Sequence, residues 1–462
     1  MKITLIEPSP PGFHIYSFIR QVRIGAPLMA TLLRDRGHDV RVFAESLGEI
    51  DWNRVLSSDL VGISTTTSTV IKGYRYAERV RAAGIPVVMG GPHVTFMVDE
   101  ALDFCDFVAR GEGEDTLLEL VDHLRGRREL EGIAGLSYRG ADGAVIHNEP
   151  RGLRPSLSDL PWPDLSLIDQ YRKIYPVPIL TSRGCPHDCE FCSVVSMFGR
   201  RYRRVQPEQV VEEVKRLRPK EVFFYDDNFI ITKKSAKKLL AQMIRQDARP
   251  RFSAQIRVDS VCKSGKVDHE LLHLLKEAGC YLVYLGLESV NPETLAAFNK
   301  EQDVDDIRGG LAALRSYGIN THGMFVFGAD TDTPESLRAT TDFAIQNHIS
   351  SVQFLALTPL PGTRTYEQLD REDRIISKNW SLYDGLHVVH RPARMTPWEL
   401  QTSVLEAHLR FYGAHRMTDN TKHRLFGFLL SNGWMRVPEN VAFLRELRTY
   451  SEGLTRLGIP GV

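Results

Sequence analysis

The chain has 462 residues, with 58 basic and 58 acidic side chains and no formal net charge. This length exceeds one ordinary hydrophobic core, so more than one domain is expected. The balanced charge gives no support to a nucleic-acid partner, and six cysteines are too few for a disulfide scaffold. No apolar run reaches the roughly 18 residues of a transmembrane segment, and the first residues do not resemble a signal peptide. We therefore expect a cytoplasmic protein.

Residues 1–130 alternate short apolar runs with amphipathic stretches. The apolar runs, which we expect to form buried strands, cover residues 3–6, 40–43, 60–63, 87–89 and 107–108. Helical periodicity is found in residues 26–35 and 73–83. Because strands separated by helix-length connections usually pair in parallel, these residues predict an α/β unit, a Rossmann-like, doubly wound parallel sheet.

The rest of the chain divides into three parts. Residues 131–176 contain a hairpin pattern around Gly140-Ala141-Asp142-Gly143 and a proline-rich connector, so we expect an interdomain bridge. Residues 177–375 repeat a strand–helix unit, which predicts a partial (β/α)6 barrel with its chemistry at the carboxyl ends of the strands. Its strand candidates are residues 178–181, 221–225, 252–256, 281–286, 323–327 and 351–357. Residues 376–462 are expected to be mainly helical.

Three cysteines, Cys185, Cys189 and Cys192, follow the first predicted barrel strand. Their C-x3-C-x2-C spacing offers three thiolates from one loop, and a four-iron cluster with one protein ligand per iron keeps one iron open. A zinc site that recruits His187 is one alternative, although a closed tetrahedron is awkward within so short a loop. A disulfide is another. The other three cysteines lie in apolar segments, where we expect them to fill the core.

The cysteine spacing resembles the signature of the radical S-adenosylmethionine (SAM) superfamily. The resemblance implies a radical SAM barrel with a 4Fe-4S cluster, whose open iron takes the amino and carboxylate groups of SAM. An electron from the cluster then cleaves SAM to a 5'-deoxyadenosyl radical. Further segments at the ends of predicted barrel strands match positions that such enzymes use to hold SAM.

The resemblance implies a role for each of these segments. Phe191 would contact the adenine of SAM, and Asp226, Asp227 and Asn228 would hold its methionyl amino group. Arg257, with Gln255 on the same strand, would hold the carboxylate, and Glu288 and Ser289 would lie near the ribose. Thr358 and Pro359 belong to a turn that would lie beside adenine and substrate. Structural alternatives stay open. The acidic run could be a solvated turn, Arg257 could form an ion pair at the barrel rim, and the Glu–Ser pair could cap a helix.

The N-terminal unit resembles the cobalamin (B12)-binding domain that precedes the barrel in a large branch of this superfamily. The match is carried by segments after predicted strands, where open parallel sheets bind ligands. The cofactor-binding candidates are Ser64, Thr65, Thr66 and Ser68 after the third strand, Gly90, Gly91 and His93 after the fourth, and Gly111, Glu112 and Gly113 after the fifth. Their hydroxyls suit a polar nucleotide tail, and their glycines let the backbone approach a flat macrocycle.

The N-terminal unit departs from many cobalamin domains in one respect. Those domains have an Asp-x-His-x-x-Gly segment whose histidine binds cobalt from below, and this chain has none. His14 and His93 are the nearest candidates, and neither has that sequence context. The sequence therefore does not identify a lower axial ligand of cobalt. It is also compatible with a domain that serves as a scaffold without binding cobalamin.

Residues 1–415 resemble a subgroup that includes hopanoid-modifying enzymes and anaerobic ring-forming cyclases. The resemblance implies an enzyme that takes electrons from a reductant such as flavodoxin or ferredoxin and acts on an apolar or lipid-like small molecule. In the favoured interpretation, the radical removes hydrogen from an unactivated carbon and methylcobalamin supplies a methyl group. The alternatives are a cyclase, rearrangement or C–C coupling enzyme without methyl transfer and, outside enzymes, an iron–sulfur or cobalamin sensor.

The C-terminal part contains a barrel-exit segment and aromatic helices. We expect the exit segment, residues 380–389, to cap the site, and we expect His387 and His390 to be structural. The aromatic residues of 425–430 and Trp434 are expected to pack on the barrel. Cover for an apolar substrate and contact with a membrane surface are the alternatives.

Overall fold

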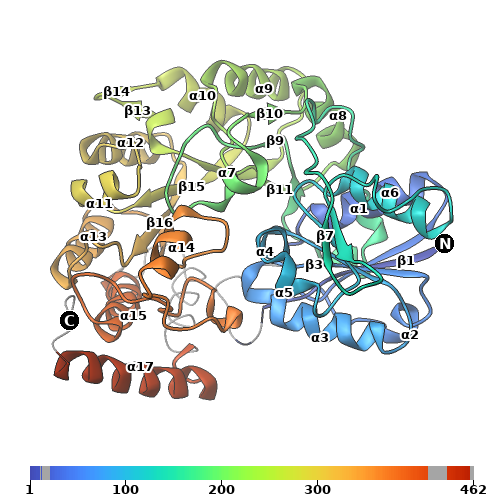
Figure 1. The fold of residues 1–462 in the computed structure, drawn as a ribbon. Coiled ribbons are helices and arrows are strands. Elements are labelled where there is room, and N and C mark those ends of the chain that lie inside the picture. Colours follow the sequence, from blue (N-terminus) through green and yellow to red (C-terminus); the bar gives the residue numbers. More distant parts are fainter. Residues whose placement is uncertain (11, 13–20, 415–433, 458–462) are drawn as a thin grey trace.

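The computed structural model describes the chain except residues 11, 13–20, 415–433 and 458–462. Two sheets lie side by side (Figure 1), the N-terminal sheet in blue and a second sheet whose strands run from green to orange. His14 and the aromatic residues of 425–430 lie outside the described residues. Within the described ranges, no helix is both long and apolar enough to cross a lipid bilayer.

The N-terminal sheet contains five parallel strands in the order β2-β1-β3-β4-β5, which confirms the predicted fold. These strands are β1 (Lys2–Glu7), β2 (Asp39–Ala44), β3 (Leu60–Ser64), β4 (Val87–Gly90) and β5 (Phe107–Ala109). The accompanying helices are α1 (Gly25–Asp35), α2 (Trp52–Val55), α3 (Val70–Arg81), α4 (Pro92–Phe96), α5 (Val98–Ala101) and α6 (Glu114–Leu124). The buried residues of α1 and α6 pack on one face and those of α3 on the other, so the sheet is doubly wound.

The expected hairpin is present, and it extends the N-terminal sheet. Strand β6 (Leu136–Arg139) pairs antiparallel with β5, and β7 (Val145–His147) pairs antiparallel with β6. Because β6 supplies the backbone partners that β5 needs on its outer side, the sheet continues past residue 130.

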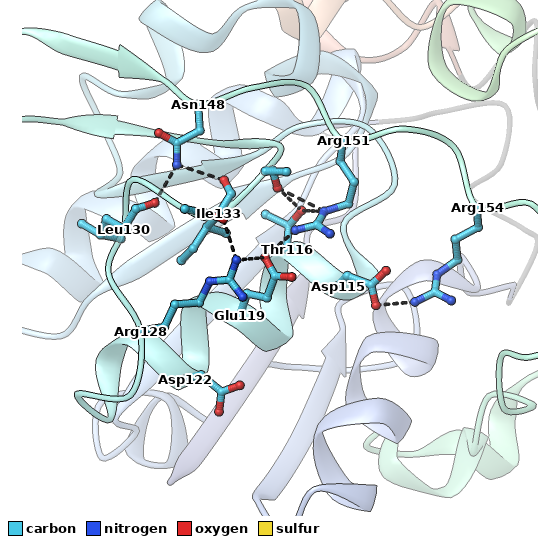
Figure 2. Close-up of polar contacts among 12 residues, drawn as sticks. Asp115, Thr116, Glu119, Asp122, Arg128, Leu130, Ile133, Asn148, Arg151 and Arg154 are labelled. Carbon is cyan, nitrogen blue, oxygen red and sulfur yellow. Dashed lines mark hydrogen bonds and ion pairs between the residues drawn. The ribbon is translucent and has the colours of Figure 1, made fainter.

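After the hairpin, residues 148–158 form an irregular strap that crosses α6 (Figure 2). The guanidinium of Arg151 pairs with Glu119 at 2.5 Å, and Arg154 pairs with Asp115. Both acidic partners belong to α6. The strap is therefore fixed to the N-terminal sheet through this helix before the chain enters the barrel.

The second sheet has six parallel strands in the order β17-β16-β15-β12-β11-β8, as a partial barrel requires. Its strands are β8 (Val177–Ile179), β11 (Glu221–Phe224), β12 (Arg251–Ile256), β15 (Cys280–Glu288), β16 (Asn320–Phe327) and β17 (Ser351–Ala356). Its helices are α8 (Pro207–Leu217), α9 (Lys233–Arg245), α10 (His269–Glu277), α11 (Pro292–Ala297), α12 (Val304–Ser316), α13 (Pro334–Gln346) and α14 (Arg364–Arg371). Elements that the periodicity did not predict are β9 (Ser182–Arg183), α7 (Ser193–Phe198), β10 (Arg203–Arg204), β13 (Cys262–Lys263) and β14 (Lys266–Val267).

Helix α15 (Pro397–Ala414) covers the exposed edge of β17. The Tyr412 hydroxyl donates to the carbonyl of Val352 at 2.8 Å and accepts from the amide of the same residue at 3.1 Å. His408 Nε2 accepts from the Phe354 amide at 3.2 Å. Backbone groups at a strand edge need such partners, so the side chains of α15 complete the barrel sheet on this side.

The barrel-exit segment returns to the N-terminal sheet. Trp380, Tyr383 and Val389 join the buried cluster on the face that α3 covers. The Trp380 indole donates to both carboxylate oxygens of Glu100 at 3.0 Å, and the turn that starts at Trp380 contacts residues 67–69 beyond β3. The segment therefore closes the N-terminal core beside the ends of its strands.

Described residues of the C-terminal part, among them Trp434 and Leu447, pack on the barrel. His387 Nδ1 lies 3.0 Å from the Asp384 carboxylate, and its Nε2 lies 3.0 Å from the Asn440 side chain of α17 (Pro438–Arg456). Trp434 is buried against the same ring. His390 is completely enclosed. The structure thus gives both histidines the packing roles that we expected.

The buried imidazole of His408 predicts an acid-sensitive barrel edge. Its Nδ1 donates to the Val404 carbonyl and its Nε2 accepts, so the ring must be neutral. Burial lowers the pKa of His408 to about 4 from 6.5. Between these pH values the unfolded chain binds the proton more readily, so stability falls as the pH is lowered through this range. For this residue alone the expected loss is about 3 kcal/mol.

Urea unfolding at a series of pH values measures this effect. His408→Gln keeps an acceptor for the Phe354 amide but does not titrate, so its free energy of unfolding should change less between pH 6.5 and 4 than that of the wild type. Burial also lowers the pKa of His390 to about 4, and this second slope should remain in the variant. An identical pH profile for variant and wild type would contradict the role of His408.

Candidate active site between the two sheets

The cysteine loop connects β9 to α7 beyond the first barrel strand. Cys185, Cys189 and Cys192 are half-buried, and every cysteine of the chain is a free thiol, which excludes the disulfide alternative. Pairing of β9 with β10 closes the base of the loop. Gly184 is required at this base because its φ is +84° and a Cβ there would lie 2.5 Å from the Arg201 carbonyl oxygen.

Asp226, which follows β11, holds the stem of the cysteine loop. Its carboxylate accepts from the Thr181 amide at 2.6 Å, from the Ser182 amide at 3.0 Å and from the Thr181 hydroxyl at 2.5 Å. Burial raises the pKa of Asp226 to about 6 in spite of these donors. This carboxylate therefore supports the stem of the cysteine loop, and its contact with SAM stays a prediction.

Two distant segments hold the outer side of the cysteine loop. Arg364, at the start of α14, donates to the Asp188 carbonyl at 2.7 Å and pairs with Glu190 at 2.5 Å. Asn299 donates to the same Asp188 carbonyl at 2.8 Å, and the Glu190 amide donates to the Phe298 carbonyl at 3.2 Å. Sequence reasoning missed these contacts because both partners lie more than a hundred positions away.

The thiols lie among buried and charged groups. Burial raises the pKa of Cys185 and Cys189, and that of Cys192 to about 12. The positive charges of Lys300 and Arg257 act in the opposite direction at Cys189. Thiolates in such surroundings need further positive charge, which metal ions supply when they bind.

Two predicted SAM-site residues have protein partners. Arg257 pairs with Asp259 at 3.0 Å and donates to the Glu301 carbonyl at 3.1 Å, so the structure shows the rim ion pair that the sequence left open. Glu288 is buried and pairs with Lys300 at 2.7 Å. The φ of Glu288 is +61°, a left-handed conformation that glutamate seldom adopts, so this strand end is strained.

The other predicted SAM-site residues lie along the same edge of the barrel sheet. Phe191 packs edge-on against Phe298 with ring centroids 5.0 Å apart. Burial and the neighbouring charge of Asp226 raise the pKa of Asp227 to about 6. Three of the remaining candidates form local hydrogen bonds: Asn228 accepts from the Ile230 amide, Ser289 accepts from the Asn291 amide, and Thr358 donates to the Ala356 carbonyl. Of the other two, Gln255 is half-buried and Pro359 is buried.

The sequence analysis also missed an aromatic row in the barrel sheet. The ring of Tyr284 on β15 lies 5.6 Å from Phe223 on β11 and 5.1 Å from His322 on β16. The neighbouring residues Phe224 and Val283 point to the opposite face, where they join the helix-covered core. Because side chains alternate along a strand, the row faces the inside of the barrel. The alternation of inward and outward residues along β11 and β15 was the sequence signal that could have predicted this aromatic row.

The first cobalamin candidates lie beyond β3. Thr66 and Thr69 form a capping box, and Ser68 is buried. Ser64 is half-buried at the strand end. Thr65 is completely buried, and its hydroxyl has no hydrogen-bond partner among the described residues. A buried hydroxyl without a partner is uncommon and points to a ligand group or water at this edge.

The glycine pair beyond β4 differs in the space around each residue. Gly91 has a φ of +106°, and a Cβ there would lie 2.2 Å from the Thr65 carbonyl oxygen, so only glycine fits. At Gly90 the nearest atom to a Cβ would be the Ala109 carbonyl oxygen, at 3.7 Å. Gly90 therefore leaves open space at the edge of the sheet.

His93 does not have the setting of an axial ligand. Its side chain is completely buried, its ring packs edge-on against Trp380 at 4.9 Å, and its Nε2 lies 3.4 Å from the Glu100 carboxylate. The ring therefore anchors the barrel-exit segment, while its Nδ1 is buried without a hydrogen-bond partner among the described residues. The predicted cofactor contact of His93 stays a prediction.

Glu112 forms buried ion pairs with arginines of β9 and β10, and its predicted cofactor contact stays a prediction. Its carboxylate pairs with Arg203 at 2.7 Å and with Arg183 at 3.1 Å, and Arg183 also pairs with Glu114 at 2.6 Å. Burial acts to raise the pKa of Glu112, but the hydrogen bond from Arg203 and the two arginine charges hold it below its ordinary value. The adjacent Gly111 has a φ of +67° and open space around its Cβ position.

The two sheets contact each other at the edges formed by the carboxyl ends of their parallel strands. Helix α4, which follows Gly91, contacts α7, which follows Cys192. A Cβ at Gly362, in the turn after β17, would lie 2.4 Å from the ring of Phe96 in α4. Ser196 of α7 donates to the Gly362 carbonyl at 2.6 Å. The glycine pair of the N-terminal sheet and the cysteine loop of the barrel therefore adjoin.

These features give two candidate cofactor sites, one on a three-cysteine loop and one on the facing edge of a doubly wound sheet. Residues 179–344 match the model of the Radical SAM superfamily, and residues 21–121 match that of the B12 binding domain. The chain belongs to the radical SAM enzymes that carry a B12-binding domain, as the sequence resemblance predicted. Its cofactors are SAM, a 4Fe-4S cluster and cobalamin.

Similar proteins include several methyltransferases. An uncharacterized methyltransferase of Pyrococcus horikoshii is 34% identical over 89% of this chain and 92% of its own. The bacteriochlorophyllide d C-12(1)-methyltransferase of Chlorobaculum tepidum is 30% identical over 80% of this chain and 78% of its own. The structure of the radical SAM methyltransferase TsrM of Kitasatospora setae, with cobalamin and a 4Fe-4S cluster bound, has a TM-score of 0.67 at 18% identity and covers 97% of this chain and 99% of TsrM. This last similarity supports the fold.

The role of Asp226 can be tested through cluster retention. Asp226→Ala leaves two buried amide donors without an acceptor, at a cost of about 1–3 kcal/mol each. We expect the iron and sulfide content of the reconstituted protein to fall about tenfold after desalting. Asp226→Asn, which keeps one acceptor oxygen, should lose less, and Asp227→Asn is the matched control. Full cluster content in Asp226→Ala would show that the loop stem does not need this carboxylate.

Proposed function

We propose that the chain is a C-methyltransferase that methylates an unactivated carbon of an apolar small molecule. When bound, the 4Fe-4S cluster with SAM supplies a 5'-deoxyadenosyl radical, and cobalamin supplies the methyl group. The observation that carries the proposal is the contact of α4, beyond the glycine pair, with α7, beyond the cysteine loop. The three similar proteins are methyltransferases by name, so we favour methyl transfer over ring closure.

The cysteine loop fits a cluster with one open iron. Cys185, Cys189 and Cys192 would each bind one iron, which leaves the fourth for SAM. Because Asp226 is engaged by the loop stem, we assign the amino group of SAM to Asp227. Arg257, whose charge reaches the thiols, would hold the carboxylate of SAM.

Other residues complete the proposed SAM site. Phe191 packs on a small apolar cluster with Phe298, Val326 and Leu357, which offers a flat surface to adenine. We propose that the remaining predicted residues line the rim around it: Asn228, Gln255, Glu288, Ser289, Thr358 and Pro359.

The N-terminal edge fits cobalamin in two respects. A polar nucleotide tail would give the buried hydroxyl of Thr65 the partner that it lacks within the described residues. The open Cβ positions of Gly90 and Gly111 would let a flat macrocycle approach the backbone. His93 is enclosed, so the proposal assigns it no role as a lower axial ligand.

The aromatic row inside the barrel supports an apolar substrate. Phe223 and Tyr284 face the interior on strands whose ends carry the proposed SAM site, so an apolar molecule would find contacts there.

We further propose that the enzyme works in the cytoplasm with flavodoxin or ferredoxin as reductant. In the proposed division of the chain, the first domain extends beyond residue 130 to include the hairpin, and the boundaries near residues 176 and 375 are kept.

Anaerobic reconstitution with iron, sulfide and hydroxocobalamin, followed by SAM and dithionite, tests the function. We expect bound cobalamin together with 5'-deoxyadenosine and S-adenosylhomocysteine as products. A variant with alanine at positions 185, 189 and 192 should lose the cluster and both products while it keeps cobalamin. 5'-Deoxyadenosine without bound cobalamin or S-adenosylhomocysteine would refute methyl transfer and favour a cyclase or coupling enzyme.

Gly90→Leu tests the cobalamin contact separately. The space around Gly90 accepts a Cβ, but a leucine side chain would extend to the edge where we place the macrocycle. Steric overlap of this kind costs about 1–3 kcal/mol, so cobalamin retention should fall about tenfold or more while iron content is unchanged. Gly90→Ala is the matched control and should retain cobalamin. Equal retention by both variants would move the cofactor away from this residue.

A further inference from the structure

Four buried charges connect the N-terminal sheet to the cysteine loop. Glu112 and Glu114 follow β5, and Arg183 on β9 pairs with both. Arg203, on β10, pairs with Glu112. The side chains of the four residues are at most 10% exposed, and their two positive and two negative charges balance. Only Gly184 separates Arg183 from Cys185, and its conformation is restricted by the nearby Arg201 carbonyl oxygen.

The two arginines enclose the cysteine loop from both ends. Arg183 precedes the first cysteine, and Arg203 follows α7, which comes after the third. The two residues face each other in the β9–β10 pair. Arg203 also donates to the carbonyl of Phe198, the last residue of α7, at 3.1 Å. Both ends of the loop are thereby tied to one carboxylate, that of Glu112.

The strap supports the same carboxylate from the opposite side. The Arg154 amide donates to Glu112 at 3.1 Å, and the Arg154 carbonyl accepts from Arg203 at 3.2 Å. Glu112 therefore has directional contacts from β9, from β10 and from the strap. Only one relative position of these elements satisfies all of them at once.

The energetics of buried charges favour a role in positioning. Two carboxylates and two guanidinium groups lose much of their hydration when they are buried, and their attraction roughly offsets this cost. Apolar side chains of similar volume would hold the two sheets together at least as strongly. Charged groups with fixed hydrogen-bond geometry instead select one arrangement.

We propose that Arg183 is a positioning residue that sets the cysteine loop at a fixed distance from the cobalamin edge of the N-terminal sheet. It does so by holding Glu112 and Glu114 at once, and it touches neither cofactor. The inference rests on the proposed function, because it concerns the distance between the two cofactors that the function requires. Its loss should leave both cofactors bound and alter their separation.

The test uses the reconstituted full chain and a spectroscopic readout. In reduced samples that contain cob(II)alamin, the spin of the cluster splits the cobalt EPR signal by an amount that depends on their distance. Arg183→Met should retain iron and cobalamin, change or broaden this splitting, and lower the ratio of S-adenosylhomocysteine to 5'-deoxyadenosine about tenfold to a hundredfold. Arg183→Lys, which keeps one charge between the two carboxylates, should recover part of the wild-type splitting.

Two further variants guard against a trivial loss of folding. Arg183→Met leaves two buried carboxylates with one arginine, so Arg183→Met combined with Glu114→Gln restores the charge balance without restoring the contact. This double variant should show the same altered splitting. Arg81→Met is the control, because the hydrogen bonds of Arg81 in α3, to Asp106 and to the Asp103 carbonyl, lie within the N-terminal domain and away from the strap. Its splitting should equal that of the wild type.

The outcomes separate this inference from the proposed function. An unchanged splitting in the double variant, with both cofactors bound, would overturn the role of Arg183 and leave the methyltransferase proposal intact. An altered splitting in Arg81→Met as well would also overturn it, because any disturbance of the N-terminal sheet would then suffice. A wild-type protein that binds a cluster but no cobalamin would overturn the proposed function and the inference with it.

Discussion

The cysteine loop has no regular structure of its own, so distant elements must hold it in place. Asp226 binds its stem from the barrel, Glu112 binds its base from the N-terminal sheet, and Arg364 binds its outer side from the sixth strand–helix unit. The contacts of Asp226 and Glu112 satisfy charged and backbone groups that would otherwise be buried without a partner, whereas those of Arg364 lie at the surface. The position of the cluster therefore depends on completion of both sheets, which explains why charged residues lie so deep between them.

Two kinds of contact join the sheets, and they act differently. Trp380 and Tyr383 add apolar area to the N-terminal core, which contributes affinity with little directional preference. The charges around Glu112 contribute little net free energy but restrict geometry. The apolar contact holds the N-terminal sheet and the barrel together, while the charged contact fixes their relative orientation. Enzymes whose two cofactors must act on one carbon need both, because small displacements of reacting groups lower rates steeply.

Much of the fold was predictable from the sequence because burial imposes patterns. Apolar runs predicted the parallel strands, and the cysteine spacing predicted the radical SAM family. The partners of polar residues were not predictable: Glu112 stands in a glycine-rich segment that suits a cofactor equally well, and Arg183, its partner, lies 71 positions away. The protein partners of Asp226 and His93 were unpredictable for the same reason, since a strand-end acid or histidine has the same sequence context whether it contacts a ligand or the protein. Only the fold brings such partners together.

The docking of Trp380 also has a consequence for how the chain folds during synthesis. Trp380 binds Glu100, which precedes it by 280 positions, and completes one face of the N-terminal sheet. A ribosome must therefore make nearly the whole barrel before the first-made sheet can bury that face. Until then an apolar surface stays uncovered on the nascent chain, and such surfaces are where chaperones bind and aggregation starts. The N-terminal domain is made first, yet its core closes only after the barrel strands have been made.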